Sequence, residues 1–114
     1  MATIIAQQIT QAGLTATTVT PEAGGDKLAN TAVQFFHVQN GNAAAITATV
    51  IPVVTTVVDP LLGTLVKENA VLILAAGEEG FLGPFEVDAF NDVDGNILIT
   101  CSLQTSVKLS ALFL

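Results

Sequence analysis

The residues of this chain that carry reactive side chains are few and lie far apart in the sequence. His37 is the only histidine and Cys101 the only cysteine. Nucleophilic catalysis needs a nucleophile, a base and an orienting group within hydrogen-bonding distance, and no acidic residue lies near His37 in the sequence. A zinc site needs several His or Cys ligands. We therefore interpret His37 as a sheet histidine and Cys101 as a buried structural thiol.

The segment Asn-Asp-Val-Asp-Gly-Asn, residues 91–96, is a candidate calcium loop. Carboxylate and amide oxygens are the ligands that calcium prefers. The EF-hand spacing is not met, because placing Gly95 at the sixth position puts Phe90 at the first and Cys101 at the twelfth. Asp-Gly is instead a pair typical of tight hairpin turns, so we expect a turn here and no metal.

Two glycine-rich segments hold the remaining polar groups of interest. Residues 24–26 read Gly-Gly-Asp, and residues 76–84 contain the acid pair Glu78 and Glu79 among three glycines. A phosphate-binding loop needs a strand-to-helix context and a Gly-Lys-Ser/Thr ending, neither of which is present, so we predict turns with solvated acids. The sequence therefore predicts no catalytic, cofactor-binding or metal-ligating residues and a protein that is not an enzyme.

The composition indicates a protein that packs against other proteins. The 114 residues are 51% hydrophobic, and only 11% are charged, against about 25% in an average soluble protein. One small domain cannot bury all of this apolar surface. We expect the excess to be buried against copies of the chain or against another protein.

The charge excludes several classes of partner. The net charge is −7, from ten acids, three lysines and no arginine, whereas nucleic-acid binders need Lys and Arg to neutralise phosphates. We therefore expect no nucleic acid and no membrane as partner. Eight of the ten acids lie between Asp59 and Asp94, so this part is expected to face water or a basic partner. The lack of Trp and Tyr argues against a sugar-binding platform.

The residue types favour strands throughout the chain. Val, Ile, Thr and Phe are frequent, and β-branched side chains suit a pleated surface. About eight short strands at spacings near 8 to 12 residues predict an all-β fold, an antiparallel β-sandwich or a jelly-roll-like barrel. We divide the chain into an amino-terminal strand or arm, residues 1–20, and a single β-sandwich domain, residues 21–114.

The strongest local signal is a predicted hairpin around Asn40-Gly41. This dipeptide suits a type I′ turn and joins two β-rich runs, residues 33–39 and 43–54. Alternation places Phe36 and Val38 on one face of the first run. Elsewhere we expect a strand over residues 14–20, a loop over 21–32, a reversal between Asp59 and Gly63, and a turn over 76–84 that carries a short apolar anchor.

The order of the turn segments resembles a group of short virion proteins of tailed bacteriophages, the capsid decoration or cement proteins. The resemblance covers residues 23–114. It depends on turn motifs that follow one another in the same order: Gly-Gly-Asp at 24–26 with Asn30 after it, Asn40-Gly41, Ala-Gly-Glu at 76–78, Gly83-Pro84-Phe85, and the turn at 91–96.

This resemblance implies a β-sandwich that binds the outside of a phage capsid and stabilises it, with no catalytic residues. The implied partners are the major capsid protein and copies of the chain itself, and the implied location is the virion, after synthesis in the host cytoplasm. Alternative functions are a head–tail connector or tail component, and a carbohydrate-binding surface module.

Two segments are the candidate contacts with such partners. The first is the amino-terminal segment 2–11, which could add a strand to a neighbour. The second is the apolar segment 81–85, for which a role as a plug of the core is the alternative. The candidate interface residues in these segments are Ile4, Ile5, Ile9, Phe81, Leu82 and Phe85.

Overall fold

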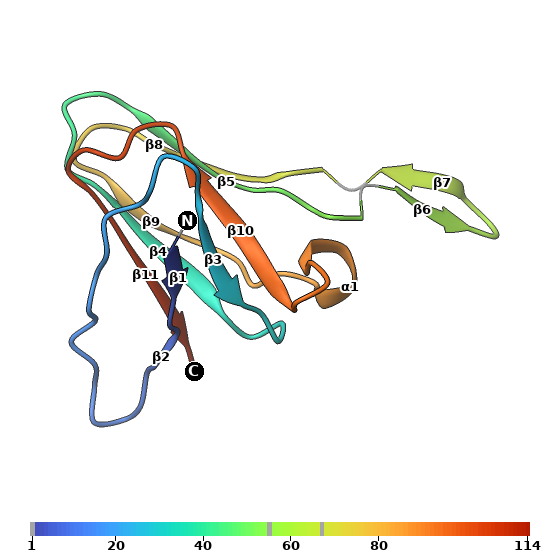
Figure 1. The fold of residues 1–114 in the computed structure, drawn as a ribbon, viewed down its shortest axis with the longest axis horizontal. Coiled ribbons are helices and arrows are strands. Elements are labelled where there is room, and N and C mark those ends of the chain that lie inside the picture. The colour runs from blue at the N-terminus through green and yellow to red at the C-terminus, as the bar shows by residue number, and fades with distance from the viewer. Residues whose placement is uncertain (1, 55, 67) are drawn as a thin grey trace.

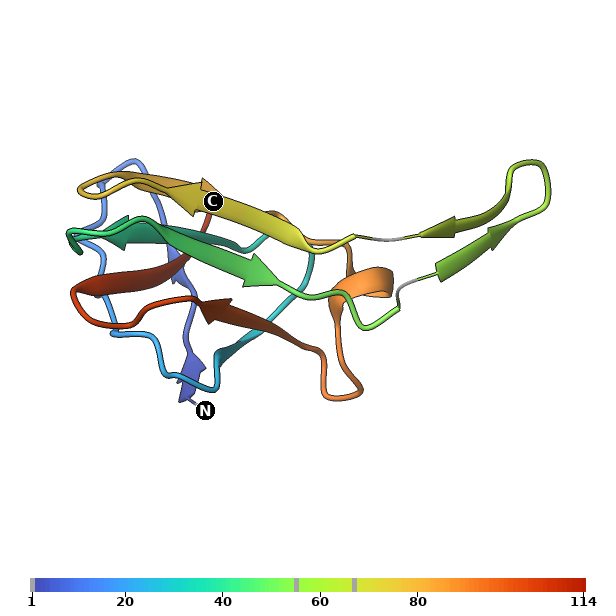
Figure 2. The same ribbon diagram turned by 90° about the horizontal axis from the view of Figure 1, so that it is seen from above.

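The chain folds into two packed β-sheets in the computed structural model, which describes residues 2–54, 56–66 and 68–114 (Figure 1). The first sheet has five strands, in the spatial order β1 (Ala2–Ile4), β3 (Asp26–Ala29), β10 (Asn96–Cys101), β5 (Ile46–Val50) and β8 (Ala70–Leu74). The second sheet has four strands, in the order β2 (Gln7–Gln8), β11 (Val107–Phe113), β4 (Phe35–Asn40) and β9 (Glu79–Leu82). The sheets stack as a sandwich and do not close into a barrel, which confirms the predicted fold class (Figure 2).

The pairing is antiparallel except where the amino-terminal segment joins the sheets. In the part of the chain that the structure describes, β1 pairs parallel with β3 and β2 pairs parallel with β11. The segment thus crosses from the edge of one sheet to the edge of the other. Both sheets are therefore mixed, a detail that the prediction of an antiparallel sandwich did not contain.

The core lies between the sheets and follows the predicted alternation. Phe36 and Val38 of β4 are buried, and so are Ile97 and Ile99 of β10, while their neighbours along each strand are partly exposed. Successive side chains of a strand point to opposite faces, so a single apolar row from each strand suffices to fill the interior. Burial of each large side chain contributes about 1.5–3 kcal/mol.

The predicted Asn40-Gly41 hairpin is wrong. β4 pairs with β11 and β9, whereas β5 belongs to the other sheet and pairs with β10 and β8. Asn40 and Gly41 therefore begin a connection between the sheets. The glycine is needed there for close packing, because a Cβ atom on Gly41 would lie 2.7 Å from the carbonyl oxygen of Ser106.

The Asn40 side chain is the reason that this connection holds its shape. Its amide nitrogen donates hydrogen bonds to the carbonyl oxygens of Ala44, Leu74 and Ala75, at 2.9, 3.2 and 3.1 Å. Its side-chain oxygen accepts a hydrogen bond from the backbone N–H of Asn42 at 2.9 Å. A buried Asn with this many partners replaces a tight turn as the device that reverses the chain.

Three further segments differ from the expectations. The predicted loop 21–32 contains β3, because Leu28 has a place in the core and the edge of β10 pairs with this segment. The predicted strand 14–20 is reduced to one bridge between Val19 and Leu109, and its side chains are mostly exposed. The predicted turn 76–84 contains β9.

A single helical turn and a separate hairpin complete the described part of the chain. The helix α1 (Val87–Phe90) packs on the sandwich through Phe85 and Phe90, whose ring centroids lie 5.4 Å apart. β6 (Thr56–Asp59) and β7 (Gly63–Val66) pair with each other as a two-stranded sheet of their own. Figures 1 and 2 show this hairpin projecting from the sandwich. Its turn confirms the predicted reversal between Asp59 and Gly63.

Candidate interaction surface

The only histidine lies on the outer face of the second sheet and belongs to an aromatic group. Its ring stacks on that of Phe81 with 4.8 Å between the ring centroids, and Phe81 meets Phe35 edge-on at 5.8 Å. The Nε2 atom of His37 lies 3.7 Å from a carboxylate oxygen of Glu79, an ion pair when the histidine is protonated. This arrangement packs β9 against β4. Among the described residues, no group of three or more His, Cys, Asp or Glu is placed to hold a metal ion.

The thiol of Cys101 is buried on the core side of β10. Burial raises the pKa of the thiol to about 11, and the nearby Asp26 carboxylate contributes in the same direction. A cysteine attacks as its thiolate, and a pKa this high leaves almost no thiolate at neutral pH. The position and the pKa both describe a structural thiol.

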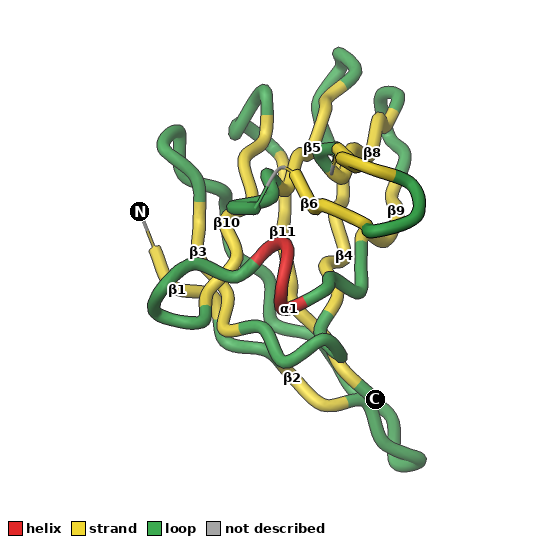
Figure 3. The backbone as a smooth tube through the Cα atoms, turned by 90° about the vertical axis from the view of Figure 1, so that its right-hand side faces the viewer, coloured by secondary structure: helices red, strands yellow, loops and turns green. Residues whose placement is uncertain are grey.

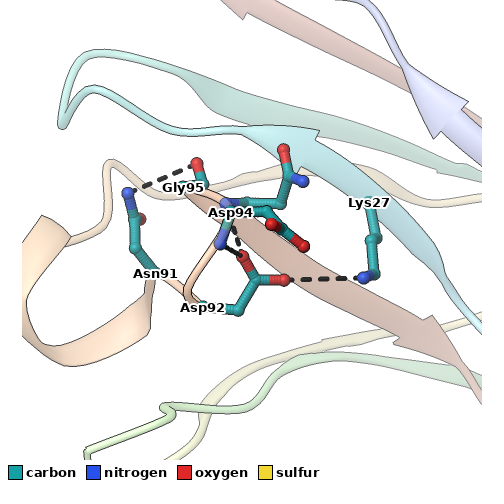
Figure 4. A network of polar contacts seen from close by, with 6 residues as sticks. Lys27, Asn91, Asp92, Asp94 and Gly95 are labelled. Carbon is teal, nitrogen blue, oxygen red and sulfur yellow. Dashed lines mark hydrogen bonds and ion pairs between the residues drawn. The ribbon is translucent and has the colours of Figure 1, made fainter.

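The turn at residues 91–96 uses its oxygens to hold its own backbone (Figure 4). One carboxylate oxygen of Asp92 accepts hydrogen bonds from the N–H groups of Asp94 and Asn96, at 2.9 and 3.0 Å. The other lies 3.5 Å from the Nζ atom of Lys27 on β3. The Asn96 hydrogen bond, followed by the one from Asp94 and the Lys27 ammonium, lowers the pKa of Asp92 against an opposing effect of burial. Asp92 thus fixes the backbone of the turn that leads into β10 and links this turn to β3 through Lys27.

The amino-terminal candidates separate into core and surface residues. Ile4 is 6% exposed and belongs to the core, whereas Ile5, the next residue, is 80% exposed. The backbone N–H of Ile9 donates a hydrogen bond to the carbonyl oxygen of Phe113 at 2.8 Å. The segment therefore pairs within its own chain along both sheets. A strand added to a neighbour stays a prediction.

The second group of candidates separates in the same way. Phe85 is buried against Phe36 and Phe90, and Leu82 packs on the core from β9. Phe81 is 63% exposed on the outer face. Of the three, Phe81 alone presents most of its side chain to solvent, where it can contact a partner.

Phe81 lines an apolar groove at the edge of the second sheet. The groove has a volume of about 510 Å³, and β9, which forms part of its wall, is an edge strand of its sheet. None of the residues that line the groove has a polar side chain. They are Ala32, Val33, Phe35, Phe81, Gly83, Pro84 and Leu114. An open apolar groove beside an edge strand is typical of a protein contact.

The projecting hairpin carries the exposed apolar residues that the sequence did not reveal. We call the side chains of Val53, Val54, Val58, Leu61 and Leu62 the hairpin patch; all are exposed, and Leu61 and Leu62 are 94% and 74% exposed. Figure 3, which looks onto this end of the molecule, shows α1 and the hairpin in front of the sheets. The signal available in the sequence was the turn between Asp59 and Gly63. It predicted a reversal of the chain but not its position outside the sandwich.

No described helix has the length and apolar character needed to cross a bilayer.

The described surface has two apolar regions suited to protein contacts, the groove at β9 and the hairpin patch. Comparison of the chain with protein families, with curated proteins and with solved structures found no match.

Proposed function

We propose that this protein is a structural virion protein that binds the outside of a phage capsid and stabilises it. The observation that carries the proposal is the amount of apolar side chain at the surface of the folded chain. Residues with large exposed apolar side chains include Ile5, Leu61, Leu62, Ile73, Phe81 and Leu114, each at least 63% exposed. Where such side chains lie together, as Phe81 and Leu114 do in the groove at β9 and Leu61 and Leu62 do in the hairpin turn, they mark sites where proteins associate.

The order of the turn motifs supports the identity of the partner. Gly-Gly-Asp at 24–26, Asn40-Gly41 and the turn at 91–96 follow one another as in the decoration proteins that the sequence resembles. A compact β-sandwich also suits a protein that sits on a shell and contacts several subunits. The acidic charge, −7 in all, favours partner surfaces that carry lysine and arginine.

Stabilisation follows from binding alone. A protein that binds the assembled shell, and not its separated subunits, shifts the equilibrium toward the shell by mass action. No reactive group is needed for this function. The shell's resistance to heat should therefore rise with the concentration of added chain.

The test is to mix the purified chain with shells of the phage that carries it, assembled without it, and to image them by electron microscopy. We expect added density at regular positions on the outer surface, and a higher temperature of shell disruption. Shells without added density at any local symmetry position would contradict the proposal. Ring-shaped oligomers of the chain alone would favour a connector or tail component, and binding on a glycan array would favour a carbohydrate-binding module.

A further inference from the structure

The hairpin formed by β6 and β7 projects from the sandwich while its base is held in place. The backbone N–H groups of Val53 and Val54, which lead into β6, donate hydrogen bonds to the carbonyl oxygen of Ala89 in α1, at 2.8 and 3.0 Å. α1 itself is anchored in the core by Ala89 and Phe90. The residues that lead toward the hairpin are therefore tied to α1, and Figure 1 shows the hairpin extending away from the sandwich.

The hairpin stands apart from both sheets in its strand pairing. Among the described strands, β6 and β7 pair only with each other, and a two-stranded hairpin alone is marginally stable in water. Its turn leaves most of the apolar surface of Leu61 and Leu62 exposed to solvent. Contact with a partner would bury both side chains and thereby stabilise the hairpin.

The surroundings of the hairpin base are acidic. Glu68, which follows β7, and Glu86, which precedes α1, line the same hollow of about 340 Å³, and Asp88 is exposed on α1 itself. Over residues 51–94 the sequence holds eight acids and a single cation, Lys67. A second copy of the chain would present the same negative charge, and like charges oppose that contact. A partner with basic residues fits this surface better.

We propose that the β6–β7 hairpin is the docking element of this protein, and that its turn inserts into an apolar cleft of another protein, rimmed by lysine or arginine. The inference rests on the proposed function, in which that protein is the shell subunit. The leucines supply the buried contact, and the acids at the base set the register and the rate of association.

The experiment compares two double variants for binding to shells assembled without the chain. Leu61→Ser with Leu62→Ser removes the apolar turn, and we expect binding to weaken at least about tenfold. Leu14→Ser with Leu103→Ser removes two exposed apolar side chains that belong neither to the hairpin patch nor to the groove at β9, and this variant should bind as the unchanged chain does. All four positions are exposed, so the melting midpoint of both variants should stay within about 3 °C of the unchanged chain.

The outcomes distinguish the docking role of the hairpin from the proposed function of the protein. Binding by the unchanged chain together with equal binding by the leucine variant overturns the docking role and leaves the proposed function intact. Loss of binding in the control variant alone places the contact outside the hairpin and overturns the docking role. Absence of binding by the unchanged chain overturns both. A dimer in solution that the leucine variant abolishes would make a second copy the occupant and overturn the choice of partner.

A second variant tests whether the partner's cleft is rimmed by basic residues. Glu68→Gln with Asp88→Asn removes two negative charges from the hairpin base, and we expect association with the shells to slow about threefold to tenfold in low salt. The difference from the unchanged chain should shrink as salt is added. A rate that does not change, or that rises, would overturn the basic rim.

Discussion

The side-chain amide of Asn30 donates a hydrogen bond of 2.7 Å to the side-chain oxygen of Asn91, across 61 positions of sequence. Asn91 in turn donates to the backbone carbonyl oxygens of Asn30 and Gly95 at 2.9 and 3.3 Å, and Asn30 donates to that of Phe85 at 3.1 Å. The pair ties the end of β3 to the segment around α1. Val53 and Val54, at the base of the projecting hairpin, donate backbone hydrogen bonds to Ala89 in this same segment.

Asn30→Ala should lower the free energy of unfolding by about 2 kcal/mol, because it leaves buried acceptors without their donor. Chemical denaturation measures the change. Gln34→Ala is the matched control, since Gln34 hydrogen-bonds only locally with Thr31 in an exposed turn; its effect should stay within about 0.5 kcal/mol. Equal effects of the two substitutions would show that the Asn30–Asn91 pair does not hold the fold.

Adjacent isoleucines of the amino-terminal segment should behave differently. Ile4 is in the core, so Ile4→Ala leaves a cavity and should cost about 2–4 kcal/mol. Ile5→Ala, at an exposed position, should change stability by less than about 0.5 kcal/mol. The measurement is the denaturant midpoint of each variant. Similar values for both would mean that β1 is not held on β3.

Asp92 should contribute to stability in a pH-dependent way. Its pKa is lowered in the folded chain, chiefly by the Asn96 N–H group, so its contribution is present above the unfolded-state pKa of about 3.9 and is lost as the pH falls through the folded-state pKa. Asp92→Asn should therefore differ most from the unchanged chain near neutral pH, and the difference should vanish in acid. Thermal unfolding between pH 2 and 7 measures it.

Asp94→Asn is the control for the loss of one negative charge in this turn, because the exposed Asp94 supplies only its backbone N–H group to the hydrogen bond with Asp92. We expect this substitution to change the free energy of unfolding at neutral pH by less than about 0.5 kcal/mol. A difference between Asp92→Asn and the unchanged chain that does not vary with pH would show that the ionised Asp92 side chain does not stabilise the fold.

The thiol of Cys101 should be inert in the folded protein. Its burial and its pKa of about 11 predict that a thiol-reactive dye labels the chain only after denaturation. Leu103→Cys adds a thiol on the neighbouring exposed turn and should be labelled at once, with a stoichiometry of one. Rapid labelling of the unchanged chain would mean that β10 opens in the folded state.

Local alternation was the part of the fold that could be predicted. Phe36 and Val38 were placed on one face of their strand because the side-chain period of a strand is two, which a sequence displays directly, and the structure buries both side chains. Pairing could not be predicted in this way. The Asn40 side chain contacts carbonyl groups 34 and 35 positions away. No local pattern distinguishes an Asn with such distant partners from the Asn of a hairpin turn.

The strand β9 was missed because its sequence has the composition of a turn. Gly80 lies inside it, and a Cβ atom there would come within 3.3 Å of the side chains of Leu72 and Leu74. The glycine therefore allows close packing between the sheets at this point, and it does not mark a reversal.

The hairpin patch was missed for the opposite reason. Apolar residues such as Leu61 and Leu62 lead one to expect burial, and only the three-dimensional arrangement shows that they lie outside the sandwich. A surface that is completed by a partner has the same composition as a core. Sequence patterns cannot separate the two.

The strand order has a consequence for how the chain is made. β10 lies at the centre of the first sheet and β11 in the interior of the second, yet the ribosome synthesises them after every strand with which they pair. Until residues 96–113 have emerged, the first sheet lacks the strand that joins β3 to β5, and the second sheet lacks the strand that joins β2 to β4. The nascent chain therefore keeps its apolar strand faces open to chaperones and to aggregation through most of translation, and both sheets are completed by the same late step.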